Sequence, residues 1–121
     1  MTACPTATPP AYTPDRAAYA AAVETLLGFT DRHRGTGGAR AAAQVLLSCY
    51  NGFDYHLDPN AIRGLSADAH RFAALTVIVQ RVLRPEEPHQ VAAEGDRRFR
   101  VLWRRYEDEL QVGHRYAGWY R

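Results

Sequence analysis

The sequence predicts a mostly α-helical fold: a small bundle of four main helices with short helical turns and at most one short extended segment. Three observations support this prediction. The length of 121 residues suits one domain, the composition of 46% hydrophobic and 23% charged residues is typical of a globular chain, and apolar residues recur at helical spacing between proline and glycine signals. We expect a helical domain over residues 14–111, between a flexible Thr/Ala/Pro-rich tail at 1–13 and an aromatic tail at 112–121.

The first helix is expected over residues 14–30. Thr13 and Pro14 form a typical helix start, because a hydroxyl can cap the free amides and proline is tolerated at the first position. Asp15 adds an acid to the first turn, where the helix dipole stabilises a negative charge. One apolar stripe follows, consisting of Tyr19, Val23, Leu26 and Leu27.

A polar, glycine-rich loop at 31–38 precedes the second helix, which is expected over residues 39–50. Asn51-Gly52 predicts a left-handed cap at its end. The inward side of this helix is predicted to hold Ala42, Ala43, Leu46, Leu47 and Tyr50.

The glycine-rich loop permits two interpretations. The amides of Gly37, Gly38 and Ala39 would form a phosphate-binding nest at the helix start, with Arg34 or Arg40 as the charged partner. The P-loop fingerprint is absent, however, because no Lys-Ser or Lys-Thr pair follows the glycines. We therefore favour the second interpretation, a turn that lets the first two helices pack antiparallel.

Residues 53–57 alternate apolar and polar side chains, which predicts a short extended segment. Its apolar side is expected to bury Tyr55 and Leu57. Its polar side, extended by one residue, holds Asp54, His56 and Asp58. Such a face could bind a divalent metal or act in acid–base chemistry. A solvated face is favoured, because Asp58 before Pro59 is a natural N-cap for a short helical turn that ends near Gly64.

The third main helix is expected to begin after an N-cap at Ser66, with Asp68 in its first turn, and to stop before Pro85. Its core side is predicted to consist of the large apolar residues and one threonine: Phe72, Leu75, Thr76, Val79, Val82 and Leu83. A stiff connector at 84–88 and a short helix at 89–94, stopped by Gly95, are expected next.

The last main helix is expected to begin with Asp96 as its cap. Its apolar residues fall within an arc of about 100° and comprise Phe99, Leu102, Trp103, Tyr106 and Leu110. The opposite side is basic and is the predicted partner-binding face, formed by Arg97, Arg98, Arg100, Arg104 and Arg105.

Asp108 and Glu109 lie four residues after Arg104 and Arg105 and are predicted to pair with them. Basic residues at the start of this helix and acids at its end oppose its dipole. Two explanations stay open, an acidic or phosphate-bearing partner and ion pairs inside the fold.

The remaining features predict neither catalysis nor a cofactor. Cys4 and Cys49 form no CxxC pair and have no histidine at zinc-ligand spacing, so we expect no metal. His70 and His89 stand at no catalytic spacing from Cys49, and we expect no enzyme.

No signal peptide or membrane span is recognisable, which predicts a cytoplasmic protein. The aromatic tail, with Tyr116, Trp119 and Tyr120, is expected either to dock over the core or to join Trp119 and Tyr120 to a protein interface.

Residues 35–110 resemble a family of small bacterial domains that is common on plasmids, phages and integrative elements. The resemblance rests on core and turn motifs: Gly37-Gly38-Ala39-Arg40, Leu46-Leu47, Tyr50-Asn51-Gly52, Asp58, Ile62-Arg63-Gly64-Leu65, Arg84-Pro85, Pro88-His89, Phe99 and Leu102-Trp103. It implies a helical fold and supplies no catalytic residue. Accessory proteins of mobile elements often inhibit CRISPR effectors or other defence systems, and this implies a similar role here.

These observations favour a non-enzymatic binding module from a mobile element that contacts a host protein or protein complex and inhibits a host defence complex in the manner of an anti-CRISPR protein. The alternative is a nucleic-acid-binding accessory protein that uses the arginines of the last helix. The net charge of +2 weighs against this alternative, because sequence-independent nucleic-acid binding depends on many basic contacts.

Overall fold

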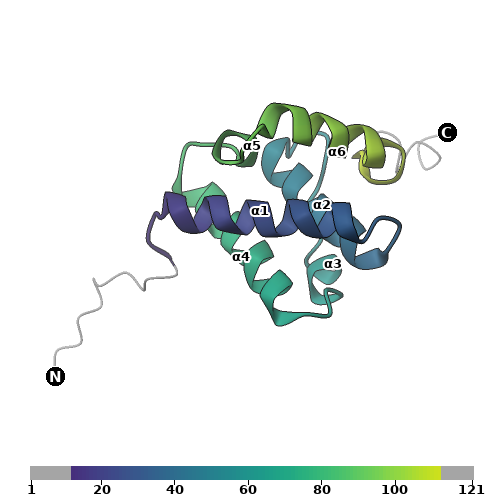
Figure 1. Ribbon diagram of the computed structural model, residues 1–121, viewed down its shortest axis with the longest axis horizontal. Helices are drawn as coiled ribbons and strands as arrows, with labels where there is room; N and C mark the ends of the chain where they lie inside the picture. Colours follow the sequence, from purple (N-terminus) through teal and green to yellow (C-terminus); the bar gives the residue numbers. More distant parts are fainter. Residues whose placement is uncertain (1–11, 113–121) are drawn as a thin grey trace, which may run out of the picture.

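The computed structural model describes residues 12–112, and these form six α-helices (Figure 1). The helices are α1 Arg16–Arg32, α2 Gly37–Tyr50, α3 Pro59–Arg63, α4 Asp68–Leu83, α5 Pro88–Val91 and α6 Gly95–Leu110. No strand occurs in the described part of the chain. The predicted bundle of four main helices with short helical turns is therefore confirmed.

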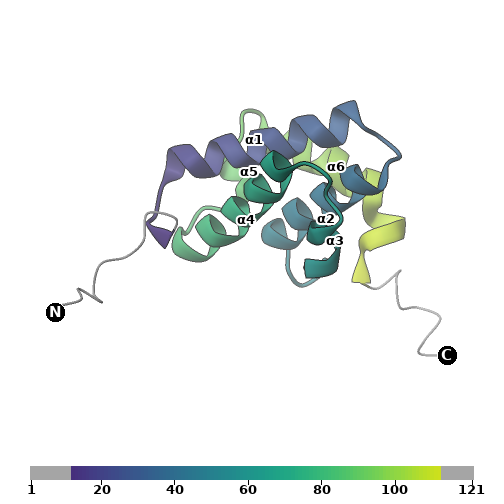
Figure 2. The same ribbon diagram turned by 90° about the horizontal axis from the view of Figure 1, so that it is seen from below.

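Helix α1 crosses the middle of the molecule. In Figure 1, α3 and α4 lie on one side of it and α5 and α6 lie on the other. Helix α4 packs against α1 and α2, whereas α6 packs against α2 and α5. Figure 2, turned by 90°, also shows α1 and α4 side by side, so α4 covers only one flank of the bundle.

Three of the four predicted apolar stripes form the core. The stripes of α1 and α2 are buried, except that Tyr50 is only partly covered, and in α6 only Trp103 keeps some exposure. Outside these stripes the loops contribute two more fully buried side chains, Tyr55 and Leu65.

Helix α4 turns the opposite side to the core from the one that the sequence predicts. Its buried residues are Ala73, Ala74, Val77 and Gln80. The predicted core residues lie on the other side, where Phe72 is 64% exposed and Val82 is 80% exposed. The two alanines remove bulk where α4 meets α1 and α2, which allows close packing of the three helices.

Several helix starts differ from the prediction. Asp15 rather than Thr13 caps α1, since its carboxylate accepts a 3.0 Å hydrogen bond from the amide of Ala18. The side-chain amide of Gln80 holds this start, accepting from the Asp15 amide at 2.7 Å and donating to the Thr13 carbonyl at 2.9 Å. Helix α4 follows Ala67 and has no side-chain cap, so the role predicted for Ser66 is wrong.

The connection between α5 and α6 is tighter than predicted. Helix α5 ends at Val91, and Gly95 is the first residue of α6 instead of a stop, with Asp96 in the first turn instead of at the cap. Glu94 reverses the chain in the left-handed conformation, at φ 51°. A Cβ on Gly95 would overlap the carbonyl oxygen of His89, so this close approach requires glycine.

Residues 52–54 form a turn and residue 55 a bend, so the extended segment predicted over residues 53–57 does not form. The side-chain oxygen of Asn51 accepts from the amides of Phe53 and Asp54 at 3.0 and 3.1 Å, and its amide donates to the Asp54 carboxylate at 2.8 Å. These local bonds fold the chain back after α2. Asn51 has φ −149° and Gly52 has no positive φ, so the predicted left-handed cap is also wrong.

Candidate functional site

The most unusual surface of the described chain is the outer side of α4. It carries Phe72, Leu75, Val79, Val82 and Leu83, a set that we name the α4 apolar surface. Their spacing of i, i+3, i+7, i+10 and i+11 places them within an arc of about 100° along the helix. Four of the five are exposed and Val79 is half-buried.

Ion pairs stand at both ends of the α4 apolar surface. At the start of α4, Arg71 donates to the Asp68 carboxylate at 2.7 Å. After its end, Arg84 donates two hydrogen bonds of 2.9 and 2.8 Å to the carboxylate of Glu86. This bidentate pairing holds the pKa of Glu86 at about 2. An apolar stripe between charged ends has the anatomy of a binding surface.

An open groove of about 950 Å³ adjoins the C-terminal half of α4. We name it the α4–α6 groove. One wall is formed by Ile78, Arg81 and Val82 of α4, and the loop after α2 contributes Leu57. Tyr50, His89 and Trp103 line it from α2, α5 and α6. Ring contacts join these last three side chains, because the ring centroid of Tyr50 lies 4.9 Å from that of His89 and 6.1 Å from that of Trp103.

Some polar groups of the groove have structural partners, whereas two buried atoms of its lining, the Tyr55 hydroxyl and Nδ1 of His89, make no hydrogen bond within the described residues. The Arg81 guanidinium donates to the carbonyl of Cys49 at 3.1 Å. In the His89 ring, Nδ1 lies 3.5 Å from the Glu87 carboxylate and Nε2 lies 3.5 Å from the Asp96 carboxylate. Burial raises the pKa of the Cys49 thiol to about 11, although Ser48 and Arg81 lower it. At neutral pH the thiol is therefore protonated, which is the wrong state for a nucleophile.

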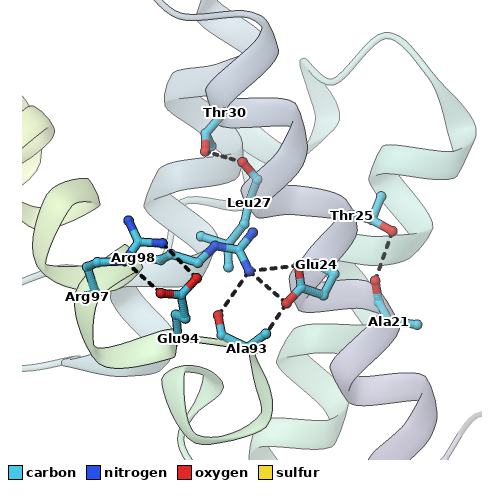
Figure 3. A network of polar contacts seen from close by, with 9 residues as sticks. All are labelled: Ala21, Glu24, Thr25, Leu27, Thr30, Ala93, Glu94, Arg97 and Arg98. Atoms are coloured by element: carbon cyan, nitrogen blue, oxygen red, sulfur yellow. Dashed lines mark hydrogen bonds and ion pairs between the residues drawn. The ribbon is translucent and has the colours of Figure 1, made fainter.

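The predicted arginine face of α6 divides into two parts. Three of its members form ion pairs: Arg97 with the neighbouring Glu94, Arg98 with Glu24, and Arg105 with Asp31, of which the last two join α6 to α1. Figure 3 shows the first two pairs, with the Arg98 guanidinium also donating to the carbonyl of Ala93 at 3.2 Å. The predicted pairing of Arg105 with Glu109 is wrong, because Glu109 pairs with Arg40 of α2.

Arg100 and Arg104 are the exposed remainder of that face. Neither forms a hydrogen bond or an ion pair with a residue in the range 12–112. They line a shallow hollow together with Asp96, Trp103 and Glu107. Ion pairs inside the fold therefore account for the basic start of α6, and only these two arginines stay available to a partner.

The glycine-rich loop serves the helix start. Thr36 is the cap of α2, and its hydroxyl accepts from the amide of Ala39 at 3.1 Å. Gly37 and Gly38 belong to the first turn of the helix, and Arg40 pairs with Glu109. One amide and one charge of the predicted phosphate nest are thus satisfied inside the protein.

The predicted polar face of Asp54, His56 and Asp58 does not form. Asp54 bonds to Asn51, and Asp58 caps α3 by accepting from the amide of Asn60 at 2.9 Å. Leu57, expected in the core, is exposed, whereas Tyr55 is buried as predicted. Among the described residues, no cluster of three or more His, Cys, Asp or Glu side chains is placed to hold a metal ion.

Trp119 and Tyr120, with Tyr116, lie outside the described residues, as does Cys4. His70 packs its ring 4.2 Å from that of Phe29, in line with a structural role. None of the helices within residues 12–112 combines the length and apolar character needed to cross a membrane.

The sequence reasoning missed the exposed character of the α4 apolar surface and the role of Gln80. The signal for the first was present, since α4 carries a second, small-residue stripe at the same helical period. No local signal marks Gln80, whose partners lie 65 and 67 residues away.

Residues 20–107 match a protein family that is described as a family of unknown function (DUF7673). No curated protein and no solved structure matches the chain.

Proposed function

The chain belongs to the DUF7673 family of unknown function, and the family assigns it no activity. From the geometry of the chain itself, we propose that it is a binding module that acts through contact with another protein. The α4 apolar surface carries this proposal. Soluble proteins seldom expose large side chains in a continuous row, and such rows usually mark interaction sites. Burying a fully exposed side chain of this size contributes about 1.5–3 kcal/mol, and each of these side chains would contribute the part that corresponds to its exposed area.

The shape of this surface favours a helical partner. Side chains at i, i+3, i+7 and i+10 form a ridge along α4, and such ridges fit the grooves of a second helix. Recognition of an amphipathic helix by an apolar strip is a common mode of protein binding. The charged pairs at the two ends, Asp68 with Arg71 and Arg84 with Glu86, would then form the polar rim.

A comparison of two variants tests the proposal. Phe72→Ser combined with Val82→Ser removes the two most exposed side chains of the α4 apolar surface, and the matched control is Val101→Ser, at an exposed apolar position on α6. We expect proteins that co-purify with the wild type and with the control to be lost with the double variant. The unfolding free energy should change by no more than about 0.5 kcal/mol, because the altered side chains lie at the surface. Retention of the same proteins by the double variant would contradict the proposal.

The specific form of this proposal is a cytoplasmic inhibitor of a host defence complex. Its support is the resemblance to domains carried by plasmids, phages and integrative elements. Expression in cells with an active CRISPR system should restore plating of a targeted phage, and the Phe72/Val82 double variant should not restore it. Equal plating with and without the wild-type protein would exclude this form while leaving partner binding by α4 open.

A second candidate function is nucleic-acid binding through α6. It is supported by Arg100 and Arg104, which are exposed, one turn apart and without ion partners among the described residues. Two phosphate contacts would give a salt slope of only about −2 on logarithmic axes. Charge reversal at both positions should abolish binding to duplex DNA or RNA at low salt, and the absence of such binding by the wild type would remove this candidate.

A further inference from the structure

The α4–α6 groove is open at the surface and has an aromatic and apolar lining. Tyr50 and Trp103 contribute rings, whereas Leu57, Ile78 and Val82 contribute aliphatic side chains. The Arg81 guanidinium is engaged with the Cys49 carbonyl, whereas the Tyr55 hydroxyl and Nδ1 of His89 are buried without a hydrogen-bond partner among the described residues. A groove of this kind suits flat, amphipathic aromatic side chains better than a charged small molecule.

Helix α6 delivers the following chain to the wall of this groove. The backbone amide of Val112, the last described residue, donates a 2.8 Å hydrogen bond to the carbonyl of Asp54. Asp54 precedes Tyr55, and the residues from Tyr55 to Leu57 belong to the groove lining. Residues 113–121 therefore begin at the rim of the groove.

We propose that residues 113–121 occupy the α4–α6 groove of the same chain and place Trp119 against Tyr50. Nine extended residues reach about 30 Å, which is ample for a groove that starts beside Asp54. The segment carries three aromatic residues and two arginines. Rings that stack on the groove lining and an arginine that pairs with Glu87 at its edge would match this composition.

This contact is separate from the proposed partner site. The groove shares only Val82 with the α4 apolar surface, so that Phe72 and Leu75 stay exposed when the groove is filled. A bound tail would extend the edge of that surface next to Val82. The docking of residues 113–121 is therefore independent of the proposed function.

The two tryptophans of the chain permit a direct test, because Trp103→Phe leaves Trp119 as the single reporter. We expect the fluorescence of Trp119 in this variant to be blue-shifted and shielded from acrylamide compared with the unfolded chain. Leu57→Glu in the groove wall should abolish the shielding. Val101→Glu, at a similarly exposed site on α6, should preserve it.

Two results would overturn the proposal: emission like that of the unfolded chain, and shielding that survives Leu57→Glu. Shielding that disappears on dilution would also overturn it, since it would assign the groove to the tail of a second copy. Should Trp103→Phe fail to fold, 5-fluorotryptophan in the wild-type chain gives the same answer. The ¹⁹F resonance of Trp119, assigned with Trp119→Phe, should then show a reduced shift between H₂O and D₂O, and a full shift would exclude docking.

Discussion

The Nη1 atom of Arg98 lies 2.8 Å from both carboxylate oxygens of Glu24, and this joins α6 to α1 across 74 residues of sequence. The same carboxylate accepts a 3.2 Å hydrogen bond from the amide of Ala93, so it also fixes the turn before α6 (Figure 3). A residue that the sequence assigns to partner binding therefore holds two helices together.

Loss of this contact should destabilise the fold. We expect Arg98→Ala to lower the free energy of unfolding by about 1.5–3 kcal/mol, the usual range for hydrogen bonds to charged groups. Arg100→Ala, two residues away and exposed, should change it by no more than about 0.5 kcal/mol. Urea unfolding of the two variants decides the matter, and equal stabilities would show that the Glu24 contact contributes nothing.

Gly95 should be the glycine that least tolerates a side chain. A methyl group there would overlap the His89 carbonyl, and we expect Gly95→Ala to cost about 3 kcal/mol or to prevent folding. Gly37→Ala is the matched control, because its Cβ meets nothing within 4 Å in the first turn of α2. Alanine there should stabilise by up to about 1 kcal/mol, by lowering the entropy of the unfolded chain. Similar melting temperatures for both variants would contradict the described α5–α6 turn.

The Glu86 carboxylate should contribute to stability in a defined pH window. Its pKa is lowered from 4.5 to about 2, mainly by the hydrogen bonds from Arg84. Because the folded-state pKa is the lower one, the contribution is present in full above about pH 4.5 and is lost as the pH falls towards 2. The stability difference between the wild type and Glu86→Gln should shrink over this window in urea titrations. A difference that is constant from pH 6 to about pH 2.5 would refute the pairing.

Cys49 should react slowly with alkylating reagents. Its pKa is raised to about 11 by burial, so that little thiolate forms at pH 8. In a Cys4→Ser background we expect iodoacetamide to modify folded Cys49 at least about tenfold more slowly than the unfolded chain, with a rate that rises with pH towards 11. Mass spectrometry gives both rates, and equal rates would mean that the thiol is neither buried nor protonated.

Periodicity predicts that α4 is a helix but not which side it buries. The helix carries a bulky stripe around Phe72 and a small stripe around Ala73 and Ala74, and both have the period of a helix. Side-chain size favours the bulky stripe, because it buries more apolar area. The close packing of α4 on α1 and α2 selects the small one. In α1, α2 and α6 the predicted stripe itself faces the core, and in α2 the burial extends over all of Ala41–Leu47.

Helix ends and the candidate site depend on contacts that local sequence does not encode. Asp15 caps α1 in preference to Thr13, whose carbonyl is held by Gln80 from the far side of the chain. The arginine face of α6 was predictable as a pattern, yet the partners of Arg98 and Arg105 come from α1. The α4–α6 groove brings together residues from 48 to 103, and only the tertiary arrangement creates it.

The α4 apolar surface is the central claim, and site-specific photo-crosslinking in the native host tests it most directly. Benzoylphenylalanine in place of Leu75 should form a covalent adduct with another protein, identified by mass spectrometry. The same residue in place of Val101, which is similarly exposed on α6, should form none. Absence of an adduct at position 75, an adduct only with a second copy of this chain, or equal adducts at both positions would contradict the claim.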